Sequence, residues 1–102
     1  MPTMKITNVF GVRDGVSTPF DLIFTQSRLS VLFQWFEHRG RLTRHTYRFA
    51  WGFIYDLAQS GKTVKISLGS SGVYIFNAAD LRTAFETADN WEVKCKSEGR
   101  TS

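Results

Sequence analysis

The segment from His38 to Arg48 (HRGRLTRHTYR) gathers most of the side chains of this chain that could recognise a charged ligand. It holds four arginines, both histidines of the protein and no acidic residue. A guanidinium group presents a planar fork that binds two phosphate oxygens at once, and aromatic rings nearby can stack on bases. The segment therefore predicts binding to a polyanion such as nucleic acid.

Nucleophilic and metal chemistry have weaker support. His38 and His45 are the only imidazoles, and together with Glu37 they lack a spacing that would bring three ligands onto one metal. Cys95 is expected on the apolar side of a strand, where a thiol acts as a small hydrophobic group. Gly61-Lys62-Thr63 lacks the upstream glycine of a phosphate-binding loop and follows a predicted helix instead of preceding one. We expect a protein that is not an enzyme and that holds no metal or cofactor.

The first predicted binding surface, which we call the arginine surface, surrounds an expected helix over residues 43–59. Arg44, Arg48 and Tyr55 fall within about 40° of one another at about 100° per residue, and Trp51 lies at the edge of that group. The alternative is that Trp51 belongs to the core and the arginines pair with carboxylates. The arginine surface consists of Arg39, Arg41, Arg44, Arg48, Trp51 and Tyr55.

The second predicted surface, which we call the sheet platform, follows from the alternation of side chains along strands. One set of residues is expected to face the helices: Val64, Ile66, Leu68, Val73, Ile75, Trp91 and Val93. The opposite face then carries Lys65, Tyr74, Phe76, Lys94 and Lys96. Two rings among three lysines are typical of a platform for single-stranded nucleic acid. The alternative is that the N-terminal hairpin, or Val31 and Trp35, covers these rings.

Both surfaces depend on a predicted order of elements. Asp14-Gly15 suits a tight turn between two strands within residues 4–24, and Pro19 predicts that the second is an edge strand or begins after it. Hydrophobic periodicity predicts helices over residues 28–39 and 43–59 and a third one capped by Asn77, with strands over 63–68, 73–76 and 91–95. The predicted fold class is α+β: a single small domain with an antiparallel or mixed sheet of four to five strands and about three helices. Its order is that of a ferredoxin-like split βαβ unit with an inserted helix.

Size and composition limit the setting in which the chain works. We expect one domain over residues 1–102, with residues 97–102 as a frayed tail, because 102 residues are close to the commonest domain size. One cysteine excludes an internal disulfide and favours a reducing compartment. No run of about 18 apolar residues is present to span a bilayer. The expected location is cytoplasmic, without membrane association.

The net charge of +4 and the pI near 9.6 favour acidic partners. The leading hypothesis is a non-catalytic module that docks a basic, aromatic surface onto nucleic acid or onto a complex that handles nucleic acid. The alternative is a small inhibitor or adaptor that occludes a larger host enzyme, by analogy with phage-encoded inhibitors such as anti-CRISPR proteins. This alternative rests on the large supply of aromatic residues, which could instead close a homodimer. The choice between DNA, RNA and protein as the target stays open at this stage.

Overall fold

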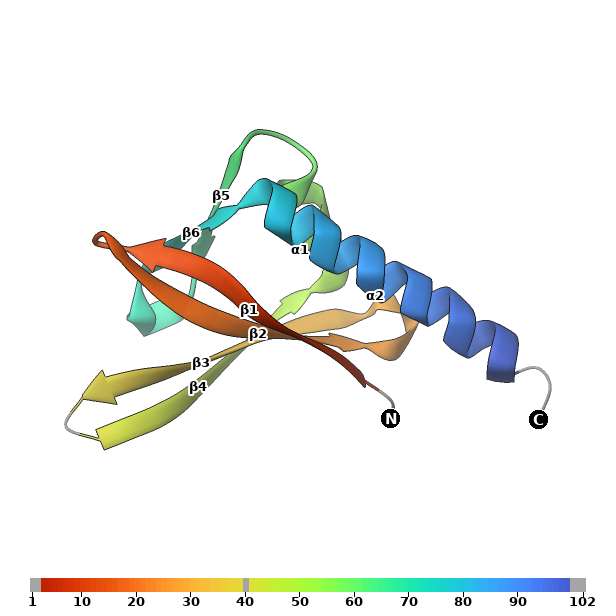
Figure 1. The fold of residues 1–102 in the computed structure, drawn as a ribbon, viewed down its shortest axis with the longest axis horizontal. Helices are drawn as coiled ribbons and strands as arrows, with labels where there is room; N and C mark the ends of the chain where they lie inside the picture. The colour runs from red at the N-terminus through yellow and green to blue at the C-terminus, as the bar shows by residue number, and fades with distance from the viewer. Residues whose placement is uncertain (1–2, 40, 100–102) are drawn as a thin grey trace.

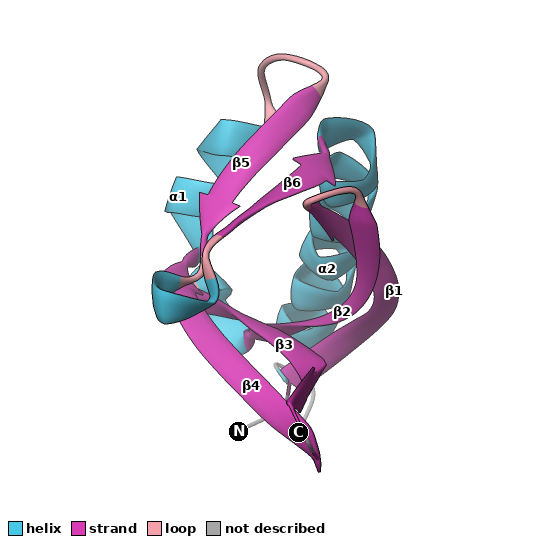
Figure 2. Cartoon of the chain, turned by 90° about the vertical axis from the view of Figure 1, so that its left-hand side faces the viewer, coloured by secondary structure: helices cyan, strands magenta, loops and turns pink. Residues whose placement is uncertain are grey.

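The computed structural model describes residues 3–39 and 41–99, and within them it does not describe the side chains of residues 38, 39 and 96–99. The elements follow one another as β1 (Thr3–Arg13), β2 (Val16–Thr25), η1 (Gln26–Arg28), β3 (Ser30–Arg39), β4 (Arg41–Ala50), α1 (Trp51–Ala58), β5 (Thr63–Ser67), η2 (Gly69–Ser71), β6 (Val73–Asn77) and α2 (Ala78–Gly99). The six strands form one antiparallel sheet in the order β4-β3-β2-β1-β6-β5. The sheet curls into a half-barrel with α1 and α2 packed against it (Figures 1 and 2).

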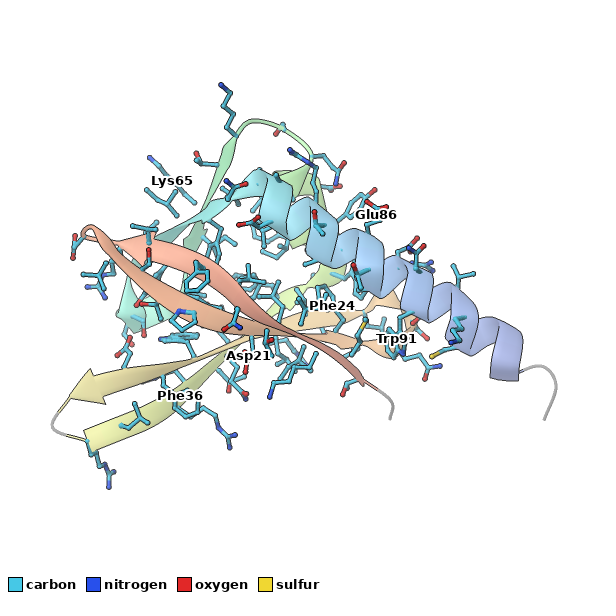
Figure 3. All side chains as sticks on the ribbon, viewed as in Figure 1. Asp21, Phe24, Phe36, Lys65, Glu86 and Trp91 are labelled. Atoms are coloured by element: carbon cyan, nitrogen blue, oxygen red, sulfur yellow. The ribbon has the colours of Figure 1, made fainter. Side chains whose placement is uncertain are left out.

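The buried side chains of the sheet lie on one face, which we call the inner face, and they form a single core with the buried residues of both helices. Neither of the two described α-helices packs on the opposite, outer face of the sheet (Figures 1 and 2). Figure 3 shows Phe24 between the sheet and α2, and Asp21 and Phe36 on the opposite side of the sheet. Among the described residues, neither helix combines the length and the apolar character needed to cross a lipid bilayer.

The predicted fold class of four to five strands with about three helices in ferredoxin-like order is wrong. Residues 30–39 and 41–50, expected to be mostly helical, are strands, and α1 spans only Trp51–Ala58. In β3, Val31, Phe33 and Trp35 are buried, whereas Phe36 on the other face is exposed. A segment with apolar residues on both faces satisfies a period of 2 and a period of 3.6 equally. Its aromatic and β-branched residues favour the strand.

The N-terminal hairpin is confirmed. Asp14 and Gly15 both adopt the left-handed backbone conformation, with φ of 52° and 75°, that a two-residue turn between twisted strands requires. Pro19 lies inside β2, opposite Phe10, so of the two predicted alternatives the one in which the strand begins after Pro19 is wrong. However, β2 pairs with β3 only from Asp21 to Phe24, so Pro19 has a strand neighbour on one side only. This local edge accommodates the missing N–H donor.

The β5–β6 hairpin and the helix after Asn77 are also confirmed. Asn77 Oδ1 accepts hydrogen bonds from the backbone N–H groups of Ala79 (2.9 Å) and Asp80 (3.3 Å), which caps α2. The predicted strand over residues 91–95 is wrong, because α2 continues to Gly99. Its buried stripe includes the fully buried Glu92, whose Oε1 accepts a hydrogen bond from the Ser27 backbone N–H (2.8 Å). Because this buried position holds a carboxylate, the hydrophobic residues of this segment do not show the period of 3.6 that is typical of a helix. Residues 97–99 of the expected tail belong to α2, and residues 100–102 lie outside the described residues.

The curl of the sheet is centred on Gly11 of β1. The fully buried ring of Phe20 in β2 lies 4.9 Å from the ring of Phe76 in β6, although β1 runs between these two strands. A Cβ atom on Gly11 would lie 2.7 Å from Cζ of Phe76 and 2.8 Å from Cε1 of Phe20. The two rings therefore meet over the bare backbone of β1. Any side chain at this position would push them apart.

We expect Gly11→Ala to lower the free energy of unfolding by about 1–3 kcal/mol, because the added methyl group overpacks the core between two rigid rings. Urea denaturation monitored by tryptophan fluorescence measures this change. Gly52→Ala in α1 is the matched control, since a Cβ there meets nothing within 4 Å. The control should raise the stability by up to about 1 kcal/mol through helix propensity. Equal effects of the two variants would contradict the packing around Gly11.

Candidate nucleic-acid interface

The β3–β4 hairpin extends beyond the rest of the sheet. The pairing of β3 with β4 continues from Ser30 and Ala50 to Arg39 and Arg41, whereas β2 reaches only as far as Gln34. Residues 35–39 and 41–45 thus form a two-stranded ribbon, which we call the arm. Five residues of strand correspond to about 16 Å of reach. Figure 1 shows the arm projecting from the body of the half-barrel.

The inner face of the arm is held to the body at its base. Trp35 is 2% exposed, and its ring stacks on that of His45 with 5.5 Å between centroids and an interplanar angle of 21°. The indole Nε1–H of Trp35 donates to Glu37 Oε1 (3.2 Å), and Glu37 Oε2 lies 3.5 Å from Nε2 of His45. The Trp35 ring also contacts that of Phe20, with 5.1 Å between centroids. These contacts fix the direction in which the arm leaves the body.

The outer face of the arm carries basic and apolar side chains. Arg44 lies opposite Phe36 in the register, and Arg48 lies opposite Leu32 nearer to the body. Phe36 and Leu42 are 52% and 59% exposed. Because Arg44 and Arg48 are four residues apart on one strand, they share a face at a separation of about 13 Å. We call Phe36, Arg41, Leu42, Arg44 and Arg48 the arm surface, of which Arg41 lies on the inner-face side near the tip.

Positive charge on the arm surface is not neutralised by nearby carboxylates. Among the residues whose side chains the structure describes, Arg41, Arg44 and Arg48 are exposed and make no ion pair, whereas Arg28 pairs with Asp89 at 2.5 Å. The sequence has no acidic residue between Glu37 and Asp56. These guanidinium groups are therefore available to an anionic ligand.

The structure separates the rest of the predicted arginine surface from the arm. Trp51 is buried, with its ring 5.0 Å from that of Phe24, so the alternative that placed it in the core agrees with the structure. Tyr55 is partly exposed on α1, and its ring packs against Phe85 (5.9 Å). The side chain of Arg39 lies outside those described. The angular grouping failed because residues 43–50 form a strand, in which side chains alternate instead of following 100° steps.

The predicted sheet platform is not formed. Tyr74 is 5% exposed and Phe76 is fully buried, whereas Val73 and Ile75 are exposed. The faces of β6 are thus the reverse of those expected, since Tyr74 pairs with the buried Ile66. The ring of Phe20 from the N-terminal hairpin lies 5.2 Å from that of Tyr74, in agreement with the alternative that this hairpin covers the rings. Lys65 lies on the outer face of β5, Lys94 lies on α2, and the Lys96 side chain is outside those described.

Sequence reasoning missed Phe36 and Leu42 as exposed apolar residues. Phe36 falls within residues 28–39, which were predicted to form a helix and form β3 from Ser30 onward. The available signal was the run of β-branched and aromatic residues on both sides of Arg39-Gly40-Arg41, which is typical of a strand hairpin. Recognising the hairpin would have placed Arg44 next to Phe36 on one face.

A concave site lies elsewhere, between α1 and α2. It has a volume of about 620 Å³ and is lined by Arg28, Trp51, Gly52, Tyr55, Gln59, Arg82, Phe85, Glu86 and Asp89. Its two arginines are already engaged: Arg28 Nε donates to Asp89 Oδ1 (2.6 Å) and Arg82 donates to the carbonyl oxygen of Ala58 (2.9 Å). Charges of both signs line this groove, so it shows no preference for an anion. Among the described residues, no group of three or more His, Cys, Asp or Glu side chains could hold a metal ion.

Comparison of the chain with protein-family models, with curated proteins and with solved structures gives no match. The arm surface is the feature that distinguishes this chain from an ordinary small domain. It combines projection from the fold, the exposed ring of Phe36 and aliphatic side chain of Leu42, and positive charge without ion pairs among the described side chains.

We expect Trp35→Ala to lower the free energy of unfolding by about 3–5 kcal/mol, because it removes a buried ring that joins the arm to the core. Phe36→Ala, one residue away on the opposite face, should cost less than about 1 kcal/mol. Trp35→Phe should fall between them, since it keeps a ring and loses the donor to Glu37. Chemical denaturation measures all three, and similar losses at residues 35 and 36 would contradict the alternating faces.

Proposed function

We propose that this chain is a non-catalytic module that binds nucleic acid through the arm surface. The observation that carries the proposal is the set of exposed guanidinium groups of Arg41 and Arg44 on a projecting ribbon and of Arg48 beside its base, with no ion pair to a described carboxylate. Arginine is suited to phosphate because its donors form a rigid fork and its charge is weakly hydrated. The arm presents this chemistry away from the body, where a large ligand can reach it.

Electrostatics support the same proposal at longer range. The protein carries a net charge of +4, and the four arginines of the segment lie between Glu37 and Asp56, in a stretch without acidic residues. Binding of these cations to phosphates releases condensed counterions, which drives association with any sequence. A cytoplasmic location is part of the proposal, since nucleic acid and the reducing conditions that keep the free thiol of Cys95 reduced are both present there.

We expect the triple variant Arg41→Ala/Arg44→Ala/Arg48→Ala to bind nucleic acid about 100-fold more weakly. Each guanidinium contact contributes about 1 kcal/mol, and three of them give about two factors of ten in the dissociation constant. On duplex DNA each phosphate contact contributes about −0.9 to the slope of log affinity against log salt. The slope should therefore change from about −3.6, for contacts by the four arginines of the segment, to about −0.9, for the one arginine that the variant keeps. Fluorescence anisotropy with labelled oligonucleotides at several salt concentrations measures both quantities.

The matched control is Lys62→Ala/Lys65→Ala/Lys94→Ala, which removes the same charge from exposed positions outside the arm. It should bind within about 3-fold of the native protein, because only long-range attraction is reduced. Equal loss in the two triple variants would mean that net charge, and not the arm surface, determines binding. Absence of binding by the native protein at low salt and micromolar concentration would remove the proposal.

A second candidate function is occlusion of a protein partner, and it is favoured by exposed apolar residues on the outer face. Phe10 of β1, with Val73 and Ile75 of β6, is at least 40% exposed there. The fully buried core of a protein interface is more apolar than the rest of the surface and is enriched in aromatic residues. The variant Phe10→Ser/Ile75→Ser separates the candidates: it should keep nucleic-acid binding, and loss of a nuclease-resistant protein complex or of a homodimer mass would support occlusion.

A further inference from the structure

We infer that the nucleic acid is B-form duplex DNA and that the arm lies in its major groove with the outer face of β3 and β4 toward the bases. This inference rests on the proposed function, because it specifies the substrate class of the arm surface. It is drawn from the dimensions of the arm, from the difference between its two faces and from the small number of described rings on its outer face.

The dimensions of the arm fit one groove. Two paired strands lie about 4.8 Å apart, and with their side chains the ribbon is about 10 Å thick. The major groove of B-form DNA, about 12 Å wide and 8.5 Å deep, admits a two-stranded ribbon, whereas the minor groove is only about 6 Å wide. The arm projects by about 16 Å, and this length of its outer face can lie along the floor of the groove. Duplex RNA is disfavoured because its major groove is too deep and narrow for side chains to read.

The two faces of the arm differ in a way that sets its orientation. The inner face is occupied at its base, where Trp35 is buried against the body beside Glu37 and His45, and Arg41 on this face lies only near the tip. On the outer face, Arg44 lies beside Phe36 at the middle of the ribbon. The nearest carboxylate on the outer face of β2 is that of Asp21, which Lys5 pairs at 3.4 Å. Base edges and phosphates are therefore met by the outer face.

Individual side chains have matching roles in this orientation. Arg44 can donate two hydrogen bonds to O6 and N7 of guanine, the commonest specific contact in the major groove. Phe36 next to it can contact a thymine methyl group. Arg48 lies about 13 Å nearer to the body on the same face, where the phosphate backbone borders the groove.

Single-stranded nucleic acid is a poorer match. Proteins that bind single strands combine a basic groove with exposed rings on which successive bases stack. In this chain Trp51, Tyr74 and Phe76 are buried in the core. The outer face of the arm offers only the ring of Phe36 among its described residues. The arm surface therefore has the charges for phosphate without a series of stacking rings.

The test compares the dissociation constants of four ligands, each about 20 nucleotides per strand, of one sequence and at one salt concentration. They are duplex DNA, duplex RNA, single-stranded DNA, and duplex DNA whose cytosines carry glucosylated hydroxymethyl groups at C5. The glucose fills the major groove and leaves the phosphate charge unchanged. We expect plain duplex DNA to bind at least 10-fold more tightly than each of the other three. A minor-groove ligand such as netropsin should change the affinity less than 2-fold.

A second variant separates base contact from charge. Arg44→Lys keeps the charge and, as an exposed substitution, should leave the thermal unfolding midpoint unchanged. It should reduce the preference for guanine-containing duplexes at least 5-fold and leave the salt slope as it is. Arg48→Lys is the matched control and should alter the guanine preference less than 2-fold.

The outcomes distinguish this inference from the proposed function. Binding of single strands, duplex RNA or glucosylated DNA as tight as that of plain duplex DNA would overturn the major-groove inference and leave nucleic-acid binding intact. Competition by netropsin with no effect of glucosylation would do the same, because it places the contact in the minor groove. If none of the four ligands binds at low salt, both the inference and the proposed function fail.

Discussion

The architecture depends on the contact that Phe20 and Phe76 make across the backbone of Gly11. Aromatic rings from two strands that are not neighbours can meet only if the strand between them has no side chain on that face and the sheet bends around it. This bend brings β6 and β2 onto one core, where Phe20 also contacts Trp35 and Tyr74. Burial of these rings supplies much of the hydrophobic stabilisation, and α1 and α2 complete it from the open side of the half-barrel.

Because of this bend, the tip of one long hairpin packs on the body and the other hairpin projects from it. The tip of the β1–β2 hairpin is tied to the body, since Arg13 donates to the carbonyl oxygen of Ser71 and its guanidinium lies 6.0 Å from the centroid of the Tyr74 ring. The β3–β4 hairpin is fixed at its base by Trp35. Beyond Gln34, β3 no longer pairs with β2. The fold thus produces one anchored hairpin and one projecting hairpin. The acid-free arginine segment coincides with the projecting one.

Local signals predicted the parts of the fold that local chemistry determines. The turn at Asp14-Gly15 and the cap at Asn77 needed no knowledge of the core. Residues 30–50 could not be assigned, because apolar side chains on both faces fit two periods, and only the core decides that β3 buries Trp35 and not Phe36. The C-terminal part of α2 was not predicted either, because the buried Glu92 interrupts its apolar stripe. For the site, the sequence pointed to the arginine segment without its shape, and the two rings assigned to it lie in α1, where Trp51 is buried and Tyr55 is exposed.

The use of arginine instead of lysine in the arm helps to distinguish a role in ligand recognition from simple protection of a sheet edge. Strand β4 is at the edge of the sheet, and edge strands commonly carry charges, lysine above all, that prevent pairing with other chains. Residues 38–55 contain four arginines and no lysine, whereas the chain as a whole has five lysines among its 13 basic residues. Protection requires only charge, which lysine supplies equally well. A planar fork is needed where two oxygens, or O6 and N7 of one base, must be bound together. The exclusive use of arginine along the arm therefore favours a role in recognition beyond keeping the edge free.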